Sequence, residues 1–196
     1  MWSRSDHHWR IEGAYNAYAR TVKALGFEPK QLDDSTLVTY REPIFYGSLS
    51  RTGRFLGCSD VINDYVLDLG NARVSLDGKR ATTESLAHRQ MYTQKGWDND
   101  LFKNRYAEYY HGDYGEIAID NDAAESQRTL LLVADSFSNS MERFYCQHYQ
   151  HVLVYDARHA KTSLDELLKR HHEVDDTLFL MWQGNIIASP FDAQLK

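Results

Sequence analysis

In this 196-residue chain, the position of Ser136 suggests a catalytic role. It follows the apolar run 129–134, where the pattern predicts a turn between a buried strand and a helix. A serine on such a turn is presented above the sheet, and free N–H groups at the helix start can stabilise a developing oxyanion. The sequence Gly-x-Ser-x-Gly of a nucleophile elbow is absent here, so a helix-capping serine is the alternative interpretation.

The second candidate segment is Ser5 to Trp9, in which Asp6 and His8 lie two residues apart. A carboxylate that accepts a hydrogen bond from an imidazole fixes the tautomer and leaves the other ring nitrogen basic. Asp and His are also metal ligands, and Asp135 could join them, although the adjacent His7 points differently and would not easily share one ion. The spacing leaves three interpretations open: a catalytic pair, a metal site or an exposed polar tail.

The surrounding pattern predicts the elements that would position these residues. Helical spacing of apolar residues predicts a helix over 11–25, and Ser163 with Glu166 has the capping-box pattern for a helix over 163–171. The remaining predictions are helices over 84–92 and 139–148 and strands over 36–41, 116–120, 129–134, 151–155 and 176–182. Alternating strands and helices in the last third predict an α/β fold with a mostly parallel sheet and helices on both faces.

Length and composition favour one domain over residues 1–196, in which 43–128 is interpreted as an irregular, β-rich insertion. The 22 basic and 28 acidic residues give a formal charge of -6, and no block of Lys and Arg points to a nucleic-acid partner. No apolar run approaches the roughly 18 residues of a membrane span. Cys58 and Cys146 are expected to be free thiols rather than a disulfide.

Several segments together resemble the bacterial DHHW protein family: "DHHW", "IEGAYNAY", "RYAEYYHGDYGEIAIDN" and "TLLLVADSFSNSMERFYCQHYQHVLVYDAR". The resemblance extends from Asp6 to about Ile187. The family is similar to SGNH-hydrolase-like proteins and to alginate O-acetyltransferases. This resemblance implies an SGNH-like or flavodoxin-like three-layer fold. It also implies a serine esterase or O-acetyltransferase that acts, without metal or cofactor, on an acylated small molecule or polysaccharide.

Carried onto this chain, the resemblance makes Ser136 the nucleophile, His8 its general base and Asp6 the orienting carboxylate. Oxyanion donors would be the Ser136 amide, Asn139 and Gly112. Relatives usually have Gly-Gly-Asn where this chain has His-Gly-Asp at 111–113. An ionised Asp113 cannot donate the hydrogen bond that an asparagine would give to the substrate oxygen.

Further candidates have a structural interpretation beside a functional one. Arg158 follows a predicted strand, where it can meet a substrate anion or form a salt bridge with Asp156 or Asp135. Aromatic residues at high density are typical of a core, but some can also stack on sugars. The candidates for such a platform are Tyr46, Trp97, Tyr110 and Tyr114.

Family members normally carry a long segment, including sheet strands, before the DHHW block. We therefore expect this chain to be an incomplete, C-terminal portion of a larger domain, whose unpaired sheet edge would favour a homodimer. The resemblance suggests an extracytoplasmic or cell-envelope location, although residues 1–9 lack the apolar core of a signal peptide. The alternative function is a catalytically inactive carbohydrate-binding or assembly module that retains the fold.

Overall fold

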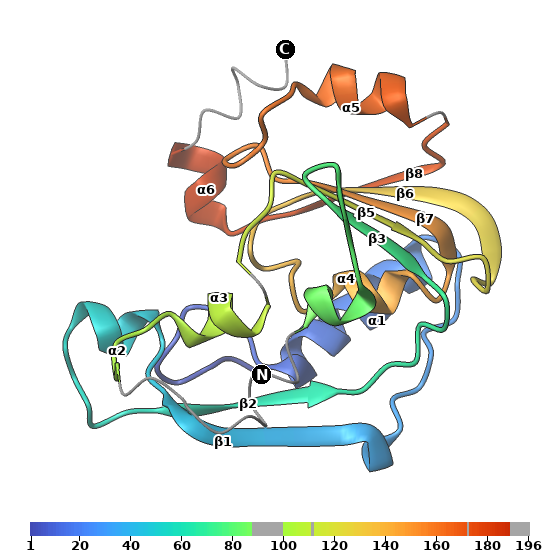
Figure 1. Ribbon diagram of the computed structural model, residues 1–196. Coiled ribbons are helices and arrows are strands. Elements are labelled where there is room, and N and C mark those ends of the chain that lie inside the picture. The colour runs from blue at the N-terminus through green and yellow to red at the C-terminus, as the bar shows by residue number, and fades with distance from the viewer. Residues whose placement is uncertain (88–99, 111, 172, 189–196) are drawn as a thin grey trace.

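A six-stranded sheet forms the centre of the molecule. The computed structural model describes residues 1–87, 100–110, 112–171 and 173–188. The strands of the large sheet are β3 (Arg73–Leu76), β4 (Lys79–Ala81), β5 (Glu116–Asp120), β6 (Ser126–Ala134), β7 (Tyr149–Tyr155) and β8 (Asp176–Leu180). They lie in the order β4-β3-β5-β7-β6-β8 (Figure 1). A separate small sheet pairs β1 (Leu37–Phe45) with β2 (Asp60–Tyr65).

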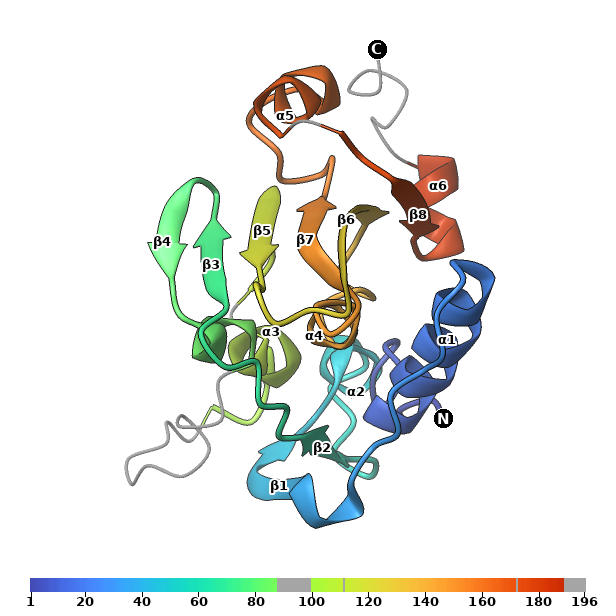
Figure 2. The same cartoon turned by 90° about the vertical axis from the view of Figure 1, so that its right-hand side faces the viewer.

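The helices are short apart from the first. They are α1 (Ile11–Ala24), α2 (Ser48–Thr52), α3 (Arg105–Tyr109), α4 (Glu142–Tyr145), α5 (Leu164–Arg170) and α6 (Gln183–Ala188), with single 3-10 turns at Asp34–Thr36 and Thr83–Leu86. In the views of Figures 1 and 2, α5 lies above the large sheet, and α1, α4 and the small sheet lie below it.

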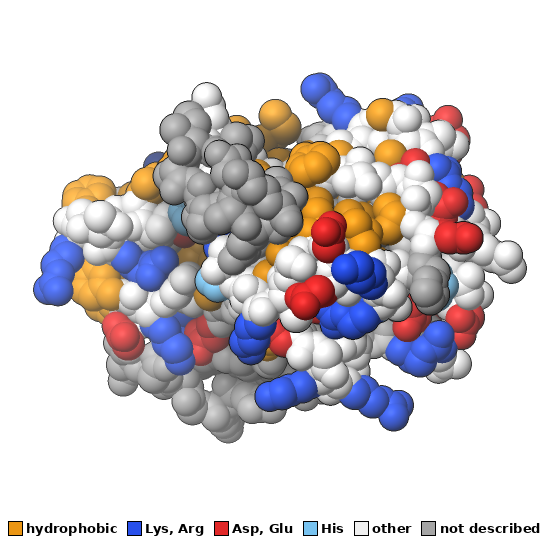
Figure 3. Space-filling view, turned by 90° about the horizontal axis from the view of Figure 1, so that it is seen from above, with side chains coloured by type: hydrophobic (Ala, Val, Ile, Leu, Met, Phe, Trp, Pro, Cys, Tyr) orange, Lys and Arg blue, Asp and Glu red, His pale blue; other side chains and the backbone are white. Residues whose placement is uncertain are grey.

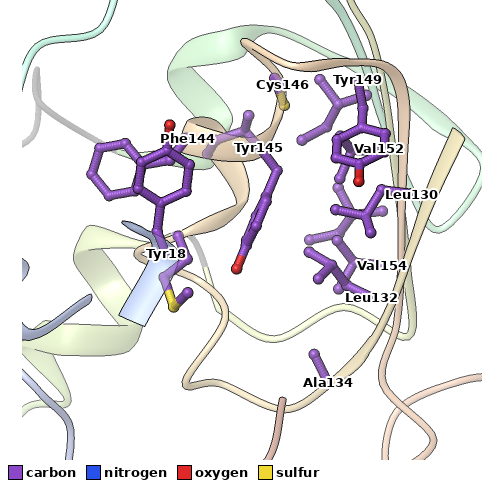
Figure 4. Close-up of a cluster of buried hydrophobic side chains, with 14 of the residues drawn as sticks. Tyr18, Leu130, Leu132, Ala134, Phe144, Tyr145, Cys146, Tyr149, Val152 and Val154 are labelled. Carbon is purple, nitrogen blue, oxygen red and sulfur yellow. The ribbon is translucent and has the colours of Figure 1, made fainter. Parts of the chain in front are cut away.

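The apolar run of β6 determines where the core lies, because successive side chains of a strand point to opposite faces of the sheet. One set of β6 side chains packs into the cluster with α1 and α4 that is drawn in Figure 4, and its members are Leu130, Leu132 and Ala134. The other set packs against Leu167 of α5, and its members are Leu131 and Val133. A strand buried on both faces reads as an uninterrupted apolar segment, which is how β6 appears in the sequence.

The predicted fold class, a mostly parallel SGNH-like or flavodoxin-like three-layer sheet, is wrong. Only β6 makes parallel pairs in the large sheet, with β7 and with β8, whereas β3–β4, β3–β5 and β5–β7 are antiparallel. Two short connections explain the difference. β5 and β6 are separated by residues 121–125, which is less than the dozen or so residues that a parallel crossover needs. Asp77 and Gly78 form a tight hairpin turn with φ of 47° and 75° between β3 and β4.

Several predicted elements are confirmed, with altered bounds. The helix expected over 11–25 is α1, and Ser163 begins α5 with the expected capping box. The helix expected over 139–148 is reduced to Glu142–Tyr145, because residues 135–141 form turns that carry Ser136. Of the helix expected over 84–92, the structure describes only the 3-10 turn, and residues 88–92 lie outside the described part.

Surface and thiol chemistry are unexceptional in the described residues. Lys and Arg side chains are interspersed with Asp and Glu over the face of the molecule seen in Figure 3. Within the described ranges, no helix has both the length and the hydropathy of a membrane span. Cys58 and Cys146 are free thiols, as expected from the sequence.

Candidate active site

The segment Ser3–Trp9 is attached to helix α2 and to the start of β2. The Asp60 carboxylate at the start of β2 accepts hydrogen bonds from the Ser5 amide and the Ser5 hydroxyl, both at 2.6 Å. The Ser5 carbonyl in turn accepts the amides of Leu49 and Ser50 at 2.9 and 3.1 Å. These contacts join residues about fifty positions apart, and they fix the backbone just before Asp6.

A chain of hydrogen bonds connects Asp6, His8 and Ser136. Asp6 Oδ1 lies 2.6 Å from His8 Nδ1, and His8 Nε2 lies 2.9 Å from Ser136 Oγ. The Ser48 amide donates to Asp6 Oδ2 at 2.6 Å and the His8 amide to Oδ1 at 2.9 Å. A proton on Nδ1, which this network assigns, leaves Nε2 free to accept the Ser136 proton. The structure therefore brings together three residues, two of which are 128 positions apart in sequence.

Tyr106 of α3 holds both His8 and Ser136 in place. Its ring stacks on the His8 imidazole, with centroids 3.7 Å apart and an interplanar angle of 4°. Its hydroxyl donates to the Ser136 carbonyl at 3.0 Å. Burial raises the pKa of Tyr106 well above its usual value, so the phenol stays protonated and remains a donor. Sequence reasoning missed this residue, although it lies in one of the segments that carried the family resemblance.

The electrostatics of the site favour an ionised Asp6. Burial would raise the pKa of this carboxyl, but the hydrogen bond and charge of His8 and the two backbone amides hold it well below its usual value. His7 lies beside the pair, with its ring 3.9 Å from the His8 ring. Burial first, and then the positive charge of His8, lower the pKa of His7. A carboxylate that stays ionised can stabilise an imidazolium formed at His8.

Asp135 stabilises the turn before Ser136. Its carboxylate accepts hydrogen bonds from the Phe137 amide at 3.0 Å and from the Trp182 amide and Asn185 Nδ2, both at 2.7 Å. The turn therefore has a capping residue, but it is Asp135 rather than Ser136. Asp135 is thereby directed toward α6, away from the metal-ligand role that the sequence left open.

Asp6, His7 and His8 are the described residues whose ligand atoms lie close enough to hold one metal ion, within 4.8 Å of one another. The expectation that His7 and His8 would not easily share an ion is therefore not supported by the geometry. Metal binding would compete with the 2.6 Å hydrogen bond between Asp6 and His8. It would also take His8 Nε2 away from Ser136 if that nitrogen were the ligand.

The other predicted donors make different contacts. Asn139 Nδ2 donates one of its two N–H groups to Asp113 Oδ1 at 3.1 Å. The Gly112 amide donates to the Ala107 carbonyl at 2.6 Å and caps α3 instead. The amide of Ser136 has no acceptor among the residues that the structure describes. Of the two predicted backbone donors, the Ser136 amide is therefore the one without an acceptor in the described residues, while Asn139 keeps one further N–H.

Arg158 and the predicted aromatic platform have mainly structural roles. The Arg158 guanidinium binds both oxygens of Asp156, with Nη2 at 2.5 Å and Nε at 2.9 Å from them, which is the salt bridge that the sequence offered as an alternative. Tyr110 is buried and Tyr114 packs against the main core. Tyr46 is half-buried in the loop that follows β1, beside Gly47. Trp97 lies outside the described residues.

Glu142 is a buried acid behind the Ser136 turn, and it predicts a pH-dependent stability. Its Oε1 accepts the Ser138 hydroxyl at 2.8 Å, and burial raises its pKa from 4.5 to about 7. Between these values the unfolded chain releases this proton and the folded chain keeps it. The unfolding free energy should therefore fall by about 2–4 kcal/mol as pH rises through this window and level off above it.

Glu142→Gln should remove this pH dependence, because a neutral amide can keep the hydrogen bond to Ser138 without titrating. Urea unfolding of both proteins at pH 5, 6, 7 and 8 gives the unfolding free energy of each as a function of pH. The difference between wild type and variant is the relevant quantity, because all other titrating groups are common to both. Parallel curves would show that Glu142 is ionised in the folded protein throughout.

Solved structures provide the comparison with known proteins. The chain is similar to a DHHW family protein from Eubacterium siraeum, with 21% sequence identity, a TM-score of 0.68 and 100% of this chain covered. It is also similar to PatB1 of Bacillus cereus, with 19% identity, a TM-score of 0.70 and 95% covered. A structure of PatB1 with a sulfonyl adduct gives 18% identity, a TM-score of 0.69 and 95% covered. This chain spans 61%, 63% and 60% of the lengths of those chains.

Sequence comparison adds nothing to this. No family model matches the chain, and no curated protein matches it. At this level of identity, structural similarity shows the fold. The chain therefore has the fold of a DHHW family protein and of PatB1 over about three fifths of their length.

Proposed function

We propose that the chain belongs to the DHHW family and is a serine esterase or O-acetyltransferase for an acylated carbohydrate. The observation that carries the proposal is the continuous hydrogen-bond chain from Asp6 through His8 to Ser136, at 2.6 and 2.9 Å. Nucleophile, base and orienting carboxylate within hydrogen-bond reach are the geometric signature of an activated serine.

In the proposed reaction, His8 Nε2 takes the proton of Ser136 Oγ while that oxygen attacks the ester carbonyl. The tetrahedral oxyanion accepts a hydrogen bond from the Ser136 amide, and ionised Asp6 stabilises the imidazolium. The intermediate collapses to an acyl-serine, and the alcohol leaves with the proton from His8. Water or a sugar hydroxyl then attacks the acyl-serine while His8 takes its proton. The bond between the acyl carbon and Ser136 Oγ breaks, Oγ regains the proton from His8, and the acid or the acylated sugar is released.

The structural neighbours support the proposal at the level of the family. The neighbour from Eubacterium siraeum is a DHHW family protein, and the "DHHW" sequence of this chain lies at residues 6–9. PatB1 has been obtained with a sulfonyl adduct. Sulfonyl groups become attached to activated nucleophiles, which is the chemistry that the Ser136 environment favours.

A fluorophosphonate tests the nucleophile without knowledge of the natural substrate. We expect one equivalent of phosphonate to attach to the wild-type protein, and peptide mass spectrometry to place it on Ser136. The Ser136→Ala variant should remain unlabelled, and prior urea denaturation should abolish labelling of the wild type. Labelling at another serine, or none in the folded protein, would contradict an activated Ser136.

One observation favours the non-catalytic alternative, a carbohydrate-binding or assembly module. The Asp113 carboxylate accepts a hydrogen bond from Asn139, so a carboxylate lies against a predicted oxyanion donor and would oppose a developing negative charge there. Absent labelling together with retained glycan binding would support this alternative. Stoichiometric labelling of Ser136 would exclude it.

A side chain at position 47 should lower the proposed activity, because it would displace Asp6. A Cβ on Gly47 would overlap the Asp6 side chain and lie 2.6 Å from Asp6 Cα and 2.5 Å from the Ser5 carbonyl. Gly47→Ala must therefore push the Asp6 segment away from its place. We expect kcat/KM for p-nitrophenyl acetate to fall by about 10²-fold, which is the scale of an ångström-size misplacement of a catalytic group.

Gly53→Ala is the matched control, because Gly53 ends the same helix α2. A Cβ there would meet the Leu49 carbonyl at 3.4 Å, an ordinary contact. This variant should keep the wild-type kcat/KM. Equal activity of both variants and the wild type would show that the placement of Asp6 does not limit the reaction.

A further inference from the structure

Aromatic side chains border the Ser136 turn. Phe137 is the next residue; it is buried, and its ring lies 6.2 Å from Trp2 and 5.9 Å from His7. The His7 ring in turn lies 6.4 Å from that of Trp182. The two tryptophans at the ends of this row are 59% and 53% exposed, for Trp2 and Trp182 respectively. Large aromatic rings left in water beside a reactive group point to a binding surface.

The backbone holds Trp182 in a defined position. Its amide donates to Asp135 Oδ2 at 2.7 Å, and Asn185 Nδ2 donates to the same oxygen at 2.7 Å. Its indole packs directly on the backbone of Gly184, where any Cβ would overlap the ring. The exposed ring is therefore positioned by its own turn and by the residue before Ser136. A ring fixed before the ligand arrives loses little conformational freedom when the ligand binds.

The row of rings also leads to the reacting atoms. His7 and Phe137 have ring centroids 3.9 and 5.1 Å from that of His8, whose Nε2 contacts Ser136. A ligand that rests on Trp182 therefore lies within a few side-chain widths of the nucleophile. Polar groups are mixed with the rings, because Ser48 Oγ lies 2.5 Å from His7 Nδ1 and the His7 side chain is 40% exposed.

We infer that Trp182, with Trp2 as a second support, is a stacking platform for the sugar ring of the ester substrate or of the acyl acceptor. This inference rests on the proposed function for its link to catalysis. The face of a pyranose ring carries C–H groups that pack on an indole, and its edge carries hydroxyls that need polar partners. The mixture of indole faces with His7 and Ser48 matches that amphipathic shape. A lipid chain or an apolar protein surface would require a continuous apolar patch.

Calorimetric titration tests the platform independently of catalysis if it is performed in the Ser136→Ala background. The probes are cellopentaose, xylopentaose and penta-N-acetylchitopentaose, each up to millimolar concentration. We expect saturable binding of at least one probe. Adding Trp182→Ala should raise the dissociation constant at least about tenfold, and Trp182→Phe should retain most of the affinity. Trp2→Ala should have a smaller effect in the same direction.

Phe179→Ala is the matched control, because Phe179 is 62% exposed and lies on β8, shortly before Trp182. It should leave the dissociation constant unchanged. No saturable binding of any probe, or equal affinity with Trp182→Ala, would overturn the inference. An equal loss with Phe179→Ala would also overturn it, because the effect would then not belong to the platform.

Turnover of p-nitrophenyl acetate separates this inference from the proposed function. That ester has no sugar, so Trp182→Ala should lower its kcat/KM by a clearly smaller factor than it lowers the affinity for the sugar probe. A loss as large as the loss of sugar affinity would show a general apolar contact and overturn the sugar platform. If Ser136→Ala retained full turnover, the proposed function would fail, and the titrations would still decide whether Trp182 binds sugars.

Discussion

Ser136→Ala should lower kcat/KM for p-nitrophenyl acetate by about 10³- to 10⁶-fold, the range observed when a serine nucleophile is removed. The reason is local: His8 Nε2 lies 2.9 Å from Ser136 Oγ, and without that oxygen no acyl-serine can form. His8→Ala should have an effect of similar size. The double variant should be no worse than either single one, because residues that act as a unit do not contribute additively.

Stability provides the control for this prediction. Ser136 is half-buried, and its hydroxyl contributes one hydrogen bond to His8, so Ser136→Ala should unfold at nearly the wild-type urea concentration. Ser163→Ala should show the opposite behaviour: it loses the capping box of α5, at a cost of about 1 kcal/mol, and keeps full activity. Multiplicative losses in the Ser136/His8 double variant would contradict a shared step.

Local signals in the sequence predicted the individual elements better than their arrangement. The α5 capping box and the buried β6 strand were both readable, because each depends on residues within a few positions. The Asp77-Gly78 turn was readable too, since Asp-Gly is a strong hairpin signal, and it would have warned of antiparallel strands. Pairing of β5 with β7 was not readable, because it depends on contacts between segments more than thirty residues apart.

The same distinction holds for the candidate site. Ser136, His8 and Asp6 were each ambiguous from local spacing, and only their joint resemblance to a family connected them. The groups that hold them in place come from elsewhere: Tyr106 from α3 and Gly47 from the loop after β1. Close approach of a glycine and stacking of two rings are tertiary features without a local sequence pattern. Structure was needed to find the residues that position the predicted ones.

The second large effect is expected at the buried ion pair between Asp64 of β2 and Arg143 of α4. Arg143 donates to Asp64 Oδ1 at 2.6 Å and to Oδ2 at 3.0 Å, and both residues are at most 1% exposed. Tyr109 of α3 donates to the same carboxylate. Asp64→Ala leaves a buried guanidinium without its counter-charge, so we expect the unfolding free energy to fall by about 3–5 kcal/mol.

A double variant separates the cost of an uncompensated charge from the contribution of the pair. Asp64→Leu with Arg143→Met removes both charges and keeps apolar volume, so it should be more stable than either single variant. Urea unfolding of the four proteins measures this coupling. A loss below about 1 kcal/mol for each single variant would show that water reaches the pair and compensates it.

The ion pair should also influence the candidate active site through α3. Tyr109 connects that helix to Asp64, and Tyr106 of the same helix stacks on His8 and donates to the Ser136 carbonyl. Tyr109→Phe keeps the ring and removes only its hydroxyl. Relative to wild type, Tyr109→Phe should therefore lower kcat for p-nitrophenyl acetate, but by a factor several times smaller than Tyr106→Ala does. Both variants should remain folded. Equal kcat values for Tyr106→Ala and wild type would mean that the stacked ring does not position His8, and that the ion pair acts on stability alone.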